Sequence, residues 1–193
     1  GTSCNIVALL EEAGKVKAGE NDFNVTVKPA SGTKANGKAV TVKVYGIHQS
    51  NFVSTVRTAQ ADVKTDYYYI MCSDVTLGAS DWSETDKVDN RITVTDTLYI
   101  PLDGNGHKLS VEGGITDGAG KYSATFTAVI GHLKSEVKNL IFAYNAKRMY
   151  ADSLESLFAM YIQNEGSVKN CYLTANVTYV NTNGGTLGST DVA

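Results

Sequence analysis

The sequence is short of several residue types, and each shortage argues against a class of protein. Its 193 residues include only 2 Pro, 3 Cys, 1 Trp and 3 His. Three Cys cannot all pair with one another, which argues against a disulfide framework. Cys72 and Cys171 lie among apolar residues, where a thiol commonly packs as a small hydrophobic side chain. The His residues have no partners at zinc-site spacing, so we expect neither a metal nor a cofactor.

Long charged runs and long apolar runs are also lacking. The 17 Lys and Arg residues are scattered among 20 Asp and Glu residues, giving a formal net charge of -3. A nucleic-acid surface needs clustered cations, so we expect no nucleic-acid partner. A membrane-spanning helix needs about 20 apolar residues, and none of the runs approaches that length. Because the chain begins Gly-Thr-Ser without Met, we expect a processed or truncated product in which any signal peptide is no longer present.

The residues that are abundant favour strands and turns. There are 18 Gly and 11 Tyr, and Thr, Val, Asn and Ser dominate the second half. Helical spacing occurs over residues 5–13, and alternating apolar residues predict a β-hairpin from 22–29 and 39–46. We therefore expect residues 1–50 to form an N-terminal cap or a small Ig-like hairpin region. A predicted helix over 51–63 would cover the first strands that follow.

An internal repeat occupies the second half of the chain. The segments 136–142 and 167–173 share Val-Lys-Asn followed by alternating apolar residues, at an offset of 31 positions. A second pair of matching segments, 126–135 and 157–166, precedes them, although residues 153–162 also fit a helical pattern. The offset predicts two inward ladders, which are Leu109, Leu140 and Cys171, and Val111, Phe142 and Leu173. Such repeats bury their inner faces by stacking, with parallel pairing between copies.

The order of these motifs resembles the GLUG-type and pectate-lyase-like right-handed parallel β-helices of bacterial surface proteins. The resemblance covers about residues 52–180. The matching pieces are Ser73-Asp-Val-Thr-Leu77, Trp82, the turn Asp103 to Leu109, and the repeats at 126–142 and 157–177. The repeats lack the Gly pair of the family motif, with Thr127-Ala128 and Phe158-Ala159 in its place. The resemblance implies an all-β fold in which residues 51–193 form a short right-handed parallel β-helix solenoid.

The same resemblance implies a function outside the cell. It favours a secreted or cell-surface binding or structural module of a longer bacterial protein, adhesin-like and carbohydrate-recognising. The implied partner is a cell-surface glycan or a host protein. Two alternatives remain, which are a polysaccharide-degrading lyase or glycosidase, and a phage or virion fibre component. The lack of a nucleophile elbow or phosphate-binding loop favours binding over catalysis.

Two sets of residues are candidates for a site. Glycosidases need two carboxyl groups about 5–10 Å apart, and one polar loop offers Asp81, Glu84, Asp86 and Asp89 as catalytic candidates. The simpler interpretation is a solvated loop. An aromatic face suits sugar rings, and the ligand-binding candidates are Tyr68, Trp82, Tyr144 and Tyr150. The competing interpretation is packing, because alternate residues of a strand face opposite sides.

Two further segments carry structural expectations. The segment Asp103-Gly-Asn-Gly-His107 has the composition of a tight turn and lacks the ligand pattern of a calcium loop. The final segment, 181–193, contains no helix or charged strand to cap the last repeat. An uncapped strand edge tends to pair, so we expect either further repeats or self-association through this end.

Overall fold

The fold is mainly strands, with two short helices. The computed structural model describes residues 6–27, 38–88, 91–114, 128–149, 157–163 and 165–180. The helical elements are α1 (Ile6–Glu12), α2 (Phe52–Val56) and the 3₁₀ turns η1 (Gln60–Asp62) and η2 (Ala79–Asp81). The strands are β1 (Gly19–Val27), β2 (Lys38–Ile47), β3 (Tyr68–Met71), β4 (Val75–Leu77), β5 (Ser83–Val88), β6 (Arg91–Thr93), β7 (Thr95–Leu98), β8 (Leu102–Asp103), β9 (Lys108–Gly114), β10 (Ile130–Leu133), β11 (Glu136–Lys138), β12 (Ile141–Met149), β13 (Ala159–Ile162), β14 (Ser167–Lys169) and β15 (Tyr172–Val180).

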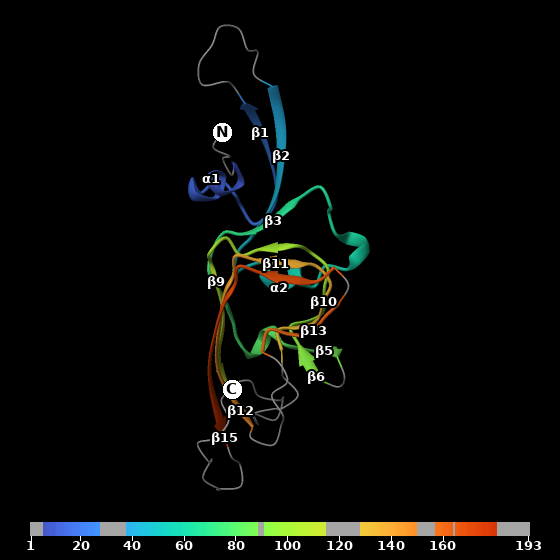
Figure 1. Ribbon diagram of the computed structural model, residues 1–193, viewed down its shortest axis with the longest axis vertical. Helices are drawn as coiled ribbons and strands as arrows, with labels where there is room; N and C mark the ends of the chain where they lie inside the picture. Colours follow the sequence, from blue (N-terminus) through green and yellow to red (C-terminus); the bar gives the residue numbers. More distant parts are fainter. Residues whose placement is uncertain are drawn as a thin grey trace.

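These strands form four sheets of mixed direction. The six-stranded sheet has the order β1-β2-β3-β8-β11-β14, the four-stranded sheet β15-β12-β9-β4, the three-stranded sheet β13-β10-β7, and β5 pairs with β6. Pairings β1–β2 and β5–β6 are antiparallel, whereas those from β3 onward in the three larger sheets are parallel. Figure 1 shows the β1–β2 hairpin projecting from one end of the molecule and the long strands β12 and β15 running together toward the other.

The expected class, an all-β right-handed parallel β-helix, is wrong for this chain. The sheets combine antiparallel and parallel pairings, and the six-stranded sheet begins with an antiparallel hairpin. The sequence pattern predicts the hairpin and the parallel repeats separately, but it does not show that β2 pairs with β3 and joins them in one sheet. The predicted helix over 51–63 corresponds to α2 followed by η1, a shorter and broken element.

The repeat predicts part of the strand register. Val137 lies opposite Val168, and Phe142 lies opposite Leu173, as the 31-residue offset requires. The backward extension is wrong, because Leu109 lies opposite Phe142 rather than Leu140. Four residues, 104–107, connect β8 to β9, whereas two residues connect β11 to β12. The longer turn shifts the register by two positions and keeps each side chain on its predicted face.

The core lies between the three larger sheets. Inward side chains from successive strands pack on one another, and Phe142 contacts Phe158 edge-on at 5.1 Å between ring centroids. The largest fully buried side chains are Tyr144, Phe52, Phe142, Ile47, Ile70, Met71, Leu77, Leu98, Ile100, Leu102, Leu109 and Leu133. A smaller apolar cluster lies on the other face of the six-stranded sheet, where α1 covers Val44 and Ile70. Helix α1 therefore packs on the part of that face formed by β2 and β3.

At one end of the sheets, residues 49–57 cover the terminal strands β4 and β7. The Gln49 amide donates Nε2–H to the Thr76 carbonyl at 3.0 Å, and its Oε1 accepts the Thr76 N–H at 2.6 Å. Arg57 donates Nε–H to the Val94 carbonyl at 2.8 Å, and α2 buries Phe52 in the core. Side chains thus replace the next strand, and we call β4, β7 and residues 49–57 the covered end.

Candidate binding face

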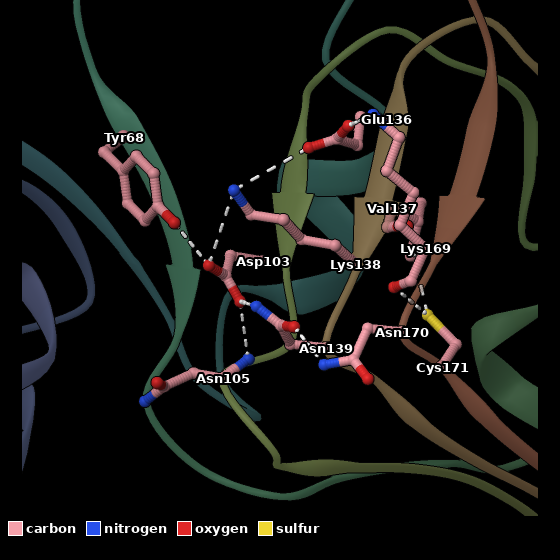
Figure 2. Close-up of polar contacts among 10 residues, drawn as sticks. All are labelled: Tyr68, Asp103, Asn105, Glu136, Val137, Lys138, Asn139, Lys169, Asn170 and Cys171. Carbon is pink, nitrogen blue, oxygen red and sulfur yellow. Dashed lines mark hydrogen bonds and ion pairs between the residues drawn. The ribbon is translucent and has the colours of Figure 1, made fainter. Parts of the chain in front are cut away.

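Polar side chains follow one another across the outer face of the six-stranded sheet. The set combines charges of both signs, with Tyr68 on β3, Asp103 on β8, Glu136 and Lys138 on β11, and Lys169 on β14 (Figure 2). These five residues are the polar strip. Parallel register brings them together, because Lys138 lies opposite Asp103 on one side and Lys169 on the other.

Asp103 is the most buried member of the polar strip, at 6 % exposure. Its carboxylate accepts hydrogen bonds from the Tyr68 hydroxyl, from Asn139 Nδ2 at 3.0 Å and from the backbone N–H of Asn105 at 2.8 Å. The Lys138 ammonium lies 3.9 Å away. A buried carboxylate is tolerated when its lone pairs are satisfied and a cation is near. Asp103 therefore organises the turn and the neighbouring strand.

Neighbouring groups shift the pKa of three members of the polar strip, Glu136, Lys138 and Tyr68. The hydrogen bond from Lys169 keeps the pKa of Glu136 below its usual value. Burial opposes the charge on Lys138, but the Tyr68 oxygen and the Asp103 carboxylate outweigh it and raise the pKa of this ammonium. Burial and the acceptor Asp103 raise the pKa of the Tyr68 phenol. At neutral pH the strip is a set of paired charges with a neutral phenol at one end.

Three asparagines stack at the turns beside the polar strip. Asn105, Asn139 and Asn170 have φ values of 50°, 52° and 49°, the left-handed region that Asn tolerates better than other side chains. Asn170 Nδ2 donates to Asn139 Oδ1 at 2.7 Å, so the amides bond from one turn to the next (Figure 2). A Cβ at Gly104 would lie 2.6 Å from Leu140 Cα, so this turn requires glycine. The stacked turns are the asparagine stack.

An open groove of about 300 Å³ runs along the asparagine stack. Its lining residues are Asn105, Gly106, Asn139, Leu140, Ile141, Asn170 and Tyr172. Tyr172 is 66 % exposed and lies opposite Ile141 in the register of the four-stranded sheet, so both side chains project outward beside the amides. The groove therefore combines flat polar amides with an aromatic ring and an aliphatic side chain. A smaller cavity of about 60 Å³ adjoins Tyr68 and Lys138.

Helix α1 is fastened to the turn that begins the groove. Glu11 accepts a hydrogen bond from Asn105 Nδ2 at 2.9 Å, and its other oxygen lies 3.3 Å from His107 Nε2. The second ring nitrogen of His107 lies 3.4 Å from Asp74 Oδ1. The Lys108 N–H, and then His107, hold the pKa of Asp74 below its usual value. These contacts fix the position of Asn105 from both sides.

Three of the predicted carboxylates, Asp81, Glu84 and Asp86, belong to η2 and β5, which are not part of the six-stranded sheet. Asp81 ends η2, where its Oδ2 accepts the Gly78 N–H at 2.8 Å, so the side chain caps a turn. Glu84 and Asp86 belong to the antiparallel strand β5. The structure describes the backbone of β5 without these two side chains, and Asp89 lies outside the described residues. The one carboxylate whose contacts are described therefore has a structural partner.

The predicted aromatic residues occupy different environments. Tyr68 belongs to the polar strip, whereas Trp82 and Tyr144 lie in the hydrophobic core, 7 % and 0 % exposed. Tyr150 falls outside the described residues. The rings of Trp82 and Tyr144 contact core side chains, so they do not share an open face with Tyr68. The packing interpretation therefore describes both residues, Tyr144 on β12 and Trp82 in the connection between η2 and β5.

The sequence prediction missed the groove, although the necessary signal was present. The recurrence of Val-Lys-Asn placed Asn139 and Asn170 at equivalent positions, and both lie in left-handed turns. Asn after a strand commonly marks such a turn. Tyr172 follows two positions after Asn170 and is therefore carried to the same edge. The prediction that Asp103 to His107 forms a tight turn is confirmed by the positive φ of Asn105 and of Gly106.

No protein-family model, curated protein or solved structure matches this chain. Within the described residues, no group of three or more His, Cys, Asp or Glu side chains is arranged to hold a metal ion. Among the described helices, none is long and apolar enough to cross a membrane.

Proposed function

We propose that this chain is a recognition module that binds carbohydrate in the groove along the asparagine stack. The observation that carries the proposal is the groove itself, where amides from successive turns lie beside the exposed Tyr172 ring. Sugars present hydroxyl groups at their rims and C–H groups on their faces. Amides can both donate to and accept from hydroxyls, and an aromatic ring packs against the apolar face.

The shape of the groove favours an extended ligand. It is open, and it crosses three parallel strands, with Gly106 at one side and Tyr172 at the other. The hydrogen bonds between Asn105, Asn139 and Asn170 and their neighbours hold the amides in place before a ligand binds. Preorganised side chains lose less conformational entropy on binding. A glycan chain lying across the turns would meet a rigid surface.

The proposal extends to where the module works. A secreted or cell-surface location, with an adhesin-like role, rests on the sequence resemblance described above. A host glycan or a polymer of the cell's own surface would both present the hydroxyl chemistry that the groove suits. The competing function is cleavage of the same polymers by the carboxylates between 81 and 89. The two functions differ in whether the bound sugar is released intact.

A glycan-array screen run beside a reducing-sugar release assay tests the proposal. We expect glycan binding without release of reducing sugar. Tyr172→Ala should weaken the affinity for the glycan at least about tenfold. Asn170→Gly removes the amide while keeping a residue that tolerates positive φ, so it should weaken binding without unfolding the turn. Tyr161→Ala, another exposed tyrosine, is the matched control.

Three outcomes would contradict the proposal. The absence of binding across the array would remove its basis. Equal loss of binding in Tyr161→Ala and Tyr172→Ala would place the site elsewhere. Release of reducing sugar, abolished by Asp81→Asn, would favour the enzyme.

A further inference from the structure

Three inward-facing apolar side chains are left uncovered at the end of the sheets opposite the covered end. Ile162 on β13, Val168 on β14 and Leu173 on β15 are 59 %, 42 % and 55 % exposed. Their counterparts on the preceding strands are Leu133, Val137 and Phe142, which are all buried in the core. Each exposed side chain thus comes from a different sheet and points in the core direction. An apolar patch of this kind marks an interaction site.

Strand edges surround this apolar patch. In the part of the chain that the structure describes, β13, β14 and β15 are each the terminal strand of a sheet. A terminal strand presents backbone N–H and C=O groups on its outer side, which makes it a template for another strand. We call β13, β14, β15 and the three apolar side chains the open end. A partner that satisfies it must supply strand edges around an apolar centre.

We propose that the open end binds the open end of a second copy of this chain, related by a two-fold axis. A two-fold axis passing beside β14 would place β14 antiparallel to its equivalent, and would bring β13 of each copy to β15 of the other. Val168 of both copies would then meet at the centre, flanked by Ile162 and Leu173. A two-fold contact uses the same surface twice, so the pairing closes at a dimer.

The geometry favours a second copy over other occupants. An added peptide strand pairs with one sheet edge and would leave two of the three apolar side chains uncovered. The covered end cannot serve as the partner surface, because Gln49 and Arg57 already bond to the backbone of Thr76 and Val94. The open end itself is the described surface that presents strand edges around an apolar centre. This inference goes beyond carbohydrate binding, since it uses side chains that face away from the groove.

Sedimentation equilibrium of the full chain over about 1–200 μM tests the inference. We expect a reversible monomer–dimer equilibrium. Val168→Lys and Leu173→Lys each place a charge in the dimer contact and should raise its Kd at least about tenfold. Val40→Lys is the matched control, because Val40 is a strand valine of 44 % exposure on the β1–β2 hairpin, away from the open end. Its Kd should equal that of the wild type.

Hydrogen exchange locates the contact independently of the variants. Raising the protein concentration should slow amide exchange in β14 and β15 while leaving β4 and β7 unchanged. A wild-type chain that stays monomeric at 200 μM would overturn the inference. So would a dimer weakened equally by Val40→Lys, or an open-ended polymer, which requires contact between two different surfaces. Glycan binding by a monomeric chain would leave the proposed function standing while this inference fails.

Discussion

The two ends of the parallel sheets solve the same physical problem in different ways. At each end, the outermost strands have edges and the hydrophobic core has a cross-section that other groups must cover. At the covered end, the Gln49 amide replaces a peptide group against β4, and Phe52 of α2 seals the core. At the open end, Ile162, Val168 and Leu173 remain in contact with solvent. The difference shows that edge protection is local, and that an end without it leaves apolar side chains in contact with solvent.

Removing the seal from the covered end should have the largest effect on stability. Phe52→Ala would leave a cavity beneath α2, because the side chain is 1 % exposed and belongs to the core cluster. We expect a loss of about 3–5 kcal/mol in the free energy of unfolding, measured by urea denaturation. Ser54→Ala, on the exposed side of the same helix, should change it by less than about 0.5 kcal/mol. Equal losses would show that α2 does not seal the core.

A matched pair of truncations compares the open end with the strand beneath it. Leu133 and Ile162 lie opposite each other on β10 and β13, one buried and one exposed. Under conditions where the chain is monomeric, Leu133→Ala should cost about 2–5 kcal/mol, and Ile162→Ala less than about 0.5 kcal/mol. Urea unfolding at low protein concentration measures both. A large loss from Ile162→Ala would mean that the open end is covered within a single chain.

Removing the Gln49 amide tests how the covered end protects its edge. Gln49→Ala loses both hydrogen bonds to Thr76, and we expect about 1 kcal/mol of destabilisation together with faster exchange of the Thr76 amide. Gln49→Glu retains an acceptor for the Thr76 N–H but loses the donor. Its Thr76 amide should therefore stay protected. Unchanged exchange in Gln49→Ala would refute the role assigned to this side chain.

The smallest effect concerns the turn that leads into β4. Because the pKa of Asp74 is lowered in the fold, its carboxylate stabilises the fold above its unfolded pKa of about 3.9, and this stabilisation disappears as the pH falls through the folded pKa. Asp74→Asn should therefore lower the free energy of unfolding at pH 7. The loss should be at most about 0.5 kcal/mol, because Asp74 is largely exposed, and it should be smaller near pH 2. Urea midpoints at the two pH values measure the difference. A larger loss at pH 2 than at pH 7 would reverse the assigned sign.

Sequence predicts what is local and what is repeated in this chain. The hairpin β1–β2 and helix α1 follow from alternation and helical spacing, and the register of β12 on β15 follows from the repeat. The joining of the hairpin to the parallel strands in one six-stranded sheet depends on the pairing of β2 with β3, which neither alternation nor the repeat predicts. Tyr144 on β12 illustrates another limit. Periodicity separates two faces of a strand, but it does not identify which face is buried.

The spacing of the parallel partners also has a consequence for the order in which the chain is made. Val137 pairs with Val168, 31 positions later, and Leu102 pairs with Val137, 35 positions later. A ribosome releases the N-terminal residues first, and closing a loop of this length costs little additional entropy over a shorter one. Each new parallel strand therefore leaves the ribosome after the strand with which it pairs. The residues of the covered end are synthesised before the strands that pair with β4 and β7. During synthesis, the most recently added strand of each sheet would therefore have an unpaired edge. Among the described strands, those of the open end are the last to be added.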